Sequence, residues 1–224
     1  MRPTLAFDVY GTLIDTNAVV TLLEKYIKDK AQLFSQTWRD KQLEYSFRRG
    51  LMENYVSFAV CTAQALDYTC DFYKISLTNE QKNELLSIYK VLPAFDEVQE
   101  SLSKLKAEGF PLYAFSNGKA DAVEMLLTQA GIRNLFLGVV SVDDIETFKP
   151  SPDVYAHFLQ SAKAKANESW LISGNPFDVT GSISAGMNAA WIQRSSDTVF
   201  DPWEIKPTMK VNSLLEFTKK INTI

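Results

Sequence analysis

The sequence predicts an α/β protein: a doubly wound parallel-sheet core that carries an inserted, all-helical cap domain. Short apolar runs alternate with helical patterns after Pro93, which is typical of a parallel sheet with helices on both faces. Between about 17 and 90, by contrast, helical periodicity dominates and no convincing strand run appears. The length of 224 residues is sufficient for one core domain with a smaller inserted one.

The first strand is expected at 4–7, an apolar run that ends at Asp8 and is followed by a turn at Gly11. We expect the cap to span 17–92 and the core to combine 1–16 with 93–224. Inside the cap, Thr78 and Gln81 have the spacing of a capping box at a helix N-terminus. Pro93 then breaks the helical pattern.

The rest of the core is expected to alternate helix and strand in a regular order. Helices with apolar stripes should contain 98–105, 123–127, 154–162 and 179–185, and a last helix should begin near Ser213. Strands are expected at 112–115, 138–142, 170–172, 189–192 and 209–211. Ligands bind outside the carboxyl ends of the strands in such sheets, and a cap inserted after the first strand would cover that edge.

Composition limits the possible partners. The net charge of −4 argues against nucleic acid, which is bound through basic surfaces. No stretch approaches the roughly 20 apolar residues of a membrane span, and no signal-peptide pattern is visible. Cys61 and Cys70 form no CxxC pair and are interpreted as reduced core residues. We therefore expect a cytoplasmic protein without nucleic-acid or membrane partners.

The single histidine narrows the chemistry. His157 lies in an expected helix with no nucleophile signature nearby, so we interpret it as a packed or solvent-facing side chain. Acid–base chemistry should then depend on carboxylates and lysine.

Polar residues follow four segments whose ends should meet at one edge of the sheet. Asp8 and Thr12 follow the first strand, Ser116 and Asn117 the second, Lys149 lies in a loop, and Ser173, Asn175 and Asp178 follow a later strand. Alone, Asp8 could cap a strand and Lys149 could be a solvated loop charge. Together they suit covalent catalysis, because hydroxyl, amide and ammonium donors keep an aspartate ionised and able to attack an electrophile. A second carboxylate, Asp178, could then activate water.

These motifs resemble the haloacid dehalogenase superfamily over essentially the whole chain. The similar segments are Phe7-Asp8-Val9-Tyr10-Gly11-Thr12-Leu13, Ser116-Asn117-Gly118, Lys149-Pro150 and Ser173-Gly174-Asn175-x-x-Asp178. Two positions depart from the commoner pattern: Gly174 stands where a second serine is frequent, and Pro176 follows Asn175. Both put the geometry of water activation in question.

Tyr10 indicates the branch of the superfamily. The phosphatases have a second aspartate there, which protonates the leaving alcohol and helps to hold magnesium. A phenol with an ordinary pKa near 10 does not suit that role at neutral pH, whereas halide leaves without an acid. Tyr10 resembles the L-2-haloacid dehalogenase branch, and the cap segment Trp38-Arg39-Asp40-Lys41-Gln42-Leu43-Glu44-Tyr45 is similar to that branch's cap signature.

The resemblance implies a mechanism and a set of residues. Asp8 attacks the chiral carbon of a small L-2-haloalkanoic acid and inverts it, and water then opens the Asp8 ester, with no cofactor and no metal. The residues implied in catalysis are Asp8, Thr12, Ser116, Lys149, Ser173, Asn175 and Asp178. The residues implied in contact with substrate or halide are Val9, Tyr10, Arg39, Phe58, Asn117, Tyr155 and Phe177.

Alternatives stay open at this point. Arg39 could be an exposed helix charge, Phe58 a packing residue and Tyr155 an aromatic on a helix face. The whole chain could be a magnesium-dependent phosphatase, or a non-catalytic relative that binds a small acid. A homodimer is expected from the resemblance only.

Overall fold

The computed structural model describes residues 2–223 and contains one six-stranded parallel sheet in the order β3-β2-β1-β4-β5-β6. The strands are β1 (Thr4–Phe7), β2 (Leu112–Ser116), β3 (Gly138–Ser141), β4 (Ser169–Ser173), β5 (Asn188–Ile192) and β6 (Met209–Val211). The order reverses at β1, which lies between β2 and β4. All six carboxyl ends therefore lie at one edge, with Asp8 near the middle of it.

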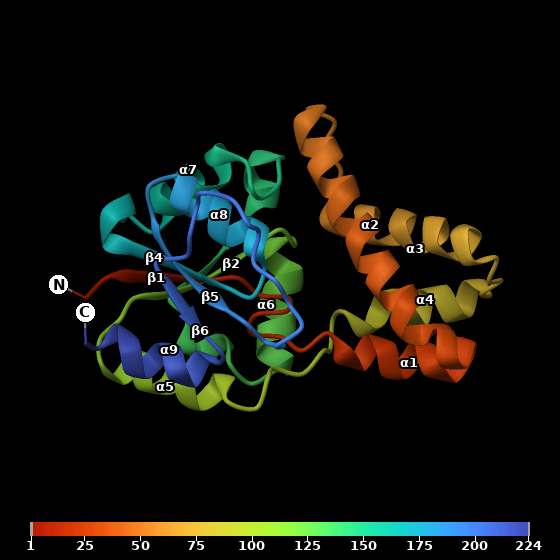
Figure 1. Cartoon of the computed structure of the whole chain (residues 1–224), viewed down its shortest axis with the longest axis horizontal. Coiled ribbons are helices and arrows are strands. Elements are labelled where there is room, and N and C mark those ends of the chain that lie inside the picture. The colour runs from red at the N-terminus through yellow and green to blue at the C-terminus, as the bar shows by residue number, and fades with distance from the viewer. Residues whose placement is uncertain (1, 224) are drawn as a thin grey trace.

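Two layers of helices cover the sheet (Figure 1). Helices α5 (Val98–Ala107) and α9 (Leu214–Ile221) pack on one face, and α7 (Pro152–Ser161) and α8 (Pro176–Ser184) on the other, while α6 (Ala120–Gln129) contacts β3. Strand side chains alternate between the faces: in β1, Leu5 and Phe7 belong to one buried apolar cluster and Ala6 to the other. The expected doubly wound core is confirmed.

All the secondary-structure elements described between β1 and α5 are helices. This inserted cap consists of α1 (Asn17–Ile27), α2 (Ala31–Leu51), α3 (Phe58–Tyr73) and α4 (Asn79–Ile88), and it projects from one side of the core in Figure 1. The capping box of Thr78 and Gln81 is present at the start of α4. Cys61 and Cys70 are free and buried. Among the residues described, no helix is long and apolar enough to cross a membrane.

The two segments that connect core and cap run side by side. The N–H of Asp15 donates to the carbonyl of Pro93, and the N–H of Phe95 donates to that of Leu13. An isolated antiparallel bridge joins Ile14 to Ala94 between them. This pairing keeps the cap over the carboxyl edge of the sheet, while the residue boundaries of the two domains stay a prediction.

Candidate active site

The turn after β1 places Asp8 at the centre of the site. The carbonyl of Val9 accepts hydrogen bonds from the N–H groups of Thr12, Leu13 and Ile14, and Gly11 takes a φ of +76°, which suits glycine. This tight turn brings the Thr12 hydroxyl back to Asp8, where it donates to Oδ2 at 2.8 Å. Thr12 Oγ1 also accepts from the N–H of Gly174 at 2.8 Å, which ties the β1 turn to the turn after β4.

The carboxylate of Asp8 is held by donors from three segments. Oδ2 accepts from Ser173 Oγ at 3.1 Å and from Asn175 Nδ2 at 2.6 Å, in addition to Thr12. Oδ1 accepts from Lys149 Nζ at 3.2 Å. Hydroxyl, amide and ammonium groups all favour the charged form of a carboxylate. Asp8 is therefore an oriented carboxylate suited to attack an electrophile.

Lys149 is buried between two carboxylates. Its ammonium donates to Asp178 Oδ2 at 2.7 Å and to the carbonyl of Phe115 at 2.9 Å, besides Asp8. Burial alone would lower the pKa of Lys149, but the charges of Asp178 and Asp8 outweigh it and raise the pKa. Lys149 is consequently a permanent cation at neutral pH.

Asp178 lies behind Lys149 and is fully buried. Its Oδ1 accepts from the hydroxyl of Tyr155 at 2.9 Å, so both of its oxygens have partners. Burial raises the pKa of Asp178 to about 6, although Lys149 acts in the opposite direction. A carboxylate with this pKa can take a proton near neutral pH.

The end of β2 completes the core side of the site. Ser116 Oγ accepts from the N–H of Gly118 at 3.1 Å, and Asn117 Oδ1 accepts from the N–H of Lys149 at 3.1 Å. These contacts fix the β2 turn next to the Lys149 loop. Ser116 and Asn117 both line the cavity above Asp8.

The cap closes the site from above. Arg39 of α2 donates from one guanidinium nitrogen to Asn175 Oδ1 at 3.2 Å and from the other to Gln42 Oε1 at 3.0 Å. A small cavity of about 20 Å³, here called the catalytic cavity, remains between cap and core. Its walls are Asp8, Tyr10, Arg39, Leu43, Phe58, Ser116, Asn117, Lys149, Asn175 and Phe177.

Tyr10 occupies the place that decides between the two branches. Its ring packs edge-on against Tyr89, with centroids 6.1 Å apart. Burial raises the pKa of Tyr10 to about 12. The phenol therefore stays protonated at neutral pH and cannot act there as a general base.

The donor set does not fit a magnesium ion beside Asp8. The Lys149 ammonium already neutralises Asp8 and Asp178 from between them, and Tyr10 supplies a neutral phenol in place of a further carboxylate. Among residues 2–223, no group of three or more His, Cys, Asp or Glu side chains is arranged to hold a metal ion.

The structure brings together all but one of the residues expected in the site. Tyr155 and Asp178 contact it from behind Lys149, and the rest line the catalytic cavity or bond directly to Asp8. Val9 differs, because its side chain is fully buried in the apolar core and lies outside the cavity wall.

Three residues of the site escaped the sequence analysis. Leu43 lines the catalytic cavity, Gln42 holds Arg39, and Tyr89 packs on Tyr10. Gln42 and Leu43 lie three and four positions after Arg39, so helical spacing places them on the same face as that arginine. For Tyr89 the sequence carries no comparable signal.

Known proteins are similar to this chain over most of its length. The model of the family described as haloacid dehalogenase-like hydrolase matches residues 5–192. The chain is 34% identical over 210 residues to an (S)-2-haloacid dehalogenase of Pseudomonas sp. (strain YL), covering 94% of this chain and 90% of that one. It is 37% identical over 191 residues to haloacetate dehalogenase H-2 of Moraxella sp. (strain B), covering 85% of each.

A solved structure shares the whole architecture. The L-2-haloacid dehalogenase from Xanthobacter autotrophicus with chloropropionic acid covalently bound superposes with a TM-score of 0.93 at 26% identity, with full coverage of both chains.

Proposed function

The chain belongs to the haloacid dehalogenase-like hydrolases, and on that basis we propose that it hydrolyses small L-2-haloacids to 2-hydroxyacids with inversion. The observation that carries this proposal is the arrangement around Asp8: an oriented carboxylate beside a buried ammonium, under an arginine, with Tyr10 in place of an acid. The names of the relatives support the same reaction.

In the first step, an oxygen of Asp8 attacks carbon 2 of the substrate from the side opposite the halogen. A carbon–oxygen bond forms, the carbon–halogen bond breaks, and the halide leaves with the bonding electrons. Arg39 and Asn117 line the cavity and suit the halide and the substrate carboxylate, since both supply N–H donors to anions. Attack from behind inverts the carbon.

In the second step, water attacks the carboxyl carbon of the Asp8 ester and gives its proton to Asp178. The bond between the carboxyl carbon and the ester oxygen then breaks, and that oxygen, which Asp8 contributed, leaves with the 2-hydroxyacid and takes the proton back from Asp178. The oxygen of water stays on Asp8, and its remaining proton passes to solvent. Each oxygen of Asp178 already accepts one side-chain hydrogen bond in this structure and retains a second lone pair that can accept the proton of water. Ser173 and Asn175, which donate hydrogen bonds to Asp8 Oδ2, keep the ester group in position during this step.

Halide release from each enantiomer of 2-chloropropionate tests the proposal. The assay is run in chelator, beside a phosphate-ester assay with added magnesium. We expect halide from the L-enantiomer alone, with D-lactate as product. Magnesium-dependent phosphate release without halide would instead assign the chain to the phosphatases.

A matched pair of variants tests the nucleophile. Asp8→Asn should lower turnover by several orders of magnitude, because an amide is a poor nucleophile. Asp153→Asn, at an exposed position on α7, should retain the parent rate. Full activity of Asp8→Asn would refute the covalent mechanism.

A further inference from the structure

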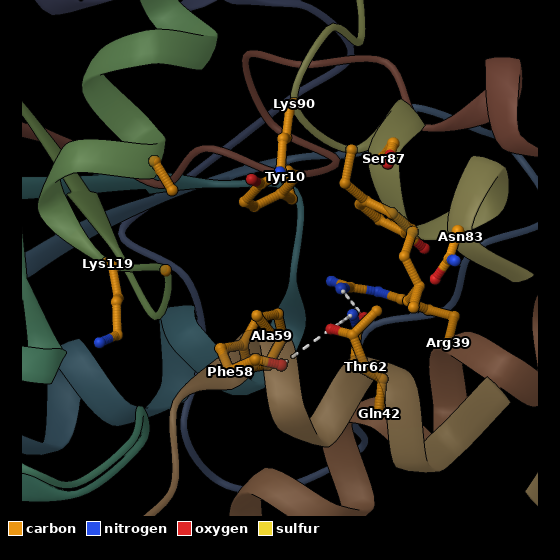
Figure 2. A pocket seen from close by; sticks show the side chains of 14 residues that line it. Tyr10, Arg39, Gln42, Phe58, Ala59, Thr62, Asn83, Ser87, Lys90 and Lys119 are labelled. Atoms are coloured by element: carbon orange, nitrogen blue, oxygen red, sulfur yellow. Dashed lines mark hydrogen bonds between the residues drawn. The ribbon is translucent and has the colours of Figure 1, made fainter. Parts of the chain in front are cut away.

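A second cavity adjoins the catalytic cavity on the cap side. It lies between cap helices α2, α3 and α4 and core helix α6, and it measures about 390 Å³ (Figure 2). Most of its wall is apolar or aromatic, with Phe58 and Ala59 from α3, Leu86 and Tyr89 at the end of α4, and Ala122 from α6. We call it the side cavity.

The two cavities meet at three shared side chains. Tyr10, Arg39 and Phe58 line both of them. In Figure 2 the guanidinium of Arg39 points toward the middle of the side cavity, with Tyr10 and Phe58 on either side. The same guanidinium bonds to Asn175 next to Asp8. A molecule held by Arg39 can therefore reach into both spaces.

The catalytic cavity and the side cavity differ strongly in volume. The catalytic cavity of about 20 Å³ has room for about one water-sized group. The side cavity is many times larger. The alkyl chain of a longer acid consequently finds no space around Asp8 itself, and the side cavity is the adjoining volume that can take it.

The charges of the side cavity favour an anion. Its charged lining residues, Arg39, Lys90 and Lys119, are all basic. Lys119 pairs with Asp143, which does not line the cavity, at 3.7 Å, so the positive charge of the side cavity rests on Arg39 and Lys90. A ligand that suits this wall has an apolar body and a negative charge near Arg39. Fatty-acid-like chains fit that description, because their tail buries apolar surface and their carboxylate pairs with a guanidinium.

We propose that the side cavity binds the alkyl chain of 2-haloalkanoic acids longer than 2-halopropionate, so that this chain accepts medium-length substrates. The inference rests on the proposed dehalogenase function. The substrate carboxylate lies at Arg39, carbon 2 faces Asp8, and the tail passes between Tyr10 and Phe58 into the side cavity.

Chain-length kinetics test this directly. kcat/KM is measured for L-2-bromopropionate, L-2-bromohexanoate and L-2-bromooctanoate. We expect the two longer acids to react within about tenfold of the shortest, because each buried methylene gains binding energy. A fall of a hundredfold or more with length in the parent protein overturns the proposal. Absence of halide from all three acids would refute the dehalogenase function itself.

Two variants fill the side cavity from opposite walls. Ala122→Phe and Ala59→Phe should each lower the ratio of kcat/KM for bromooctanoate to that for bromopropionate by at least tenfold. Ala107→Phe is the matched control, since Ala107 is exposed on α5, outside the side cavity, and it should leave the ratio unchanged. An unchanged ratio in a folded Ala122→Phe or Ala59→Phe protein contradicts the assignment.

Inhibition by a non-reacting acid supplies a readout apart from turnover. Octanoate should inhibit bromopropionate hydrolysis more strongly than propionate does, by at least tenfold in inhibition constant, and Ala122→Phe should remove that difference. Equal inhibition by the two acids in the parent protein would overturn the proposal.

Discussion

At the scale of single residues, the site is balanced in charge. Asp8 and Asp178 contribute two negative charges, and Lys149 and Arg39 two positive ones, so their formal charges cancel. In the proposed first step the charge of Asp8 passes to the departing halide, and Lys149 is left with Asp178 as its partner. Since Asp8 raises the pKa of Asp178, ester formation removes that influence and helps Asp178 to stay ionised.

The raised pKa of Asp178 predicts how turnover depends on pH. Ester hydrolysis needs the ionised carboxylate of Asp178. We therefore expect kcat to fall about tenfold per pH unit once the pH drops below about 6. The halide burst of the first turnover does not use Asp178 as a base and should persist through that range. Rapid mixing at pH 5 and pH 7.5 measures both phases, and a parallel decline of the burst and kcat would speak against Asp178 as the base.

The effect of Asp178 on stability has the opposite sign. Its folded-state pKa of about 6 lies above the ordinary value of 3.8, so the folded protein binds this proton more tightly than the unfolded chain does. The contribution of Asp178 to the free energy of unfolding therefore falls as pH rises from about 4 to 6 and is constant above that.

At position 174 the surrounding backbone leaves room only for glycine. A Cβ built on it would lie 2.5 Å from the carbonyl oxygen of Gly11, which is too close for any side chain. The turn after β4 thus approaches the turn after β1 through this glycine, at the position where the family resemblance implies a second serine. The departure from the commoner pattern is a matter of packing between these turns.

We predict that Gly174→Ser, although it restores the commoner residue, damages this protein. The new side chain must push the Gly11 carbonyl away, which costs about 1–3 kcal/mol and moves Thr12 relative to Asp8. Turnover should fall about tenfold or more, measured as halide release, and the urea midpoint should drop. Gly50→Ala is the control, because its Cβ meets nothing closer than 3.5 Å and alanine favours the helix. Equal behaviour of the two variants would contradict this account.

At the scale of elements, the segments that connect core and cap are joined to the sheet by Arg194, just after β5. Its guanidinium donates to the carbonyl of Thr12, pairs with Glu97 and lies 3.8 Å over the ring of Phe95. Glu97 also accepts from the N–H of Leu214, at the start of α9. Arg194 and Glu97 together therefore connect both segments to the start of the last helix.

Arg194→Leu should consequently destabilise the whole protein. Loss of the guanidinium leaves Glu97, about one-fifth exposed, without its cation and frees the Thr12 carbonyl. Hydrogen bonds to charged groups contribute roughly 1.5–3 kcal/mol each, so we expect a loss of about 2–3 kcal/mol in urea unfolding. Lys165→Met, which breaks the exposed Lys165–Glu168 pair, should change stability by less than about 0.5 kcal/mol. A similar effect in both variants would show that Arg194 contributes no more than a surface charge.

Most helices and strands of the core could be predicted from the sequence. The central strands are continuous apolar runs because both faces of a parallel sheet are buried. One strand prediction was too long: the strand expected at 138–142 ends at Ser141, and Val142 starts a 3-10 helix. Ser141 Oγ accepts from the N–H of Asp143 and turns the chain there. The end of this strand depends on a local hydrogen bond, which the pattern of apolar residues in the sequence does not indicate.

At the scale of the whole molecule, the strand-end residues could be predicted because parallel topology brings them to one edge. The contribution of the cap could not be obtained in this way. Which helix face meets the core depends on packing between segments far apart in sequence. Arg39 and Phe58 were therefore expected only from resemblance, and Leu43 was not expected at all.

One of the contacts between cap and core joins Tyr55, between α2 and α3, to the core loop after β3. The Tyr55 hydroxyl donates to Asp143, and its ring lies 5.0 Å from that of Phe148. Phe58 reaches the same phenylalanine with centroids 6.2 Å apart. Phe148 directly precedes Lys149, so this contact couples cap position to the loop that carries the buried ammonium.

Tyr55→Phe should loosen this closure without disturbing either domain. It removes one hydrogen bond to a charged group and keeps the packing of the two rings, so the contact should weaken by roughly 1.5–3 kcal/mol, which corresponds to at least about tenfold more opening. The backbone N–H of Lys149 donates a hydrogen bond to Asn117 Oδ1, and its hydrogen exchange should accelerate by that factor. Tyr26→Phe is the matched control, because the Tyr26 hydroxyl bonds to Glu84 entirely within the cap. If Lys149 exchanged at the parent rate in Tyr55→Phe, or equally fast in both variants, the Tyr55 contact would not govern closure.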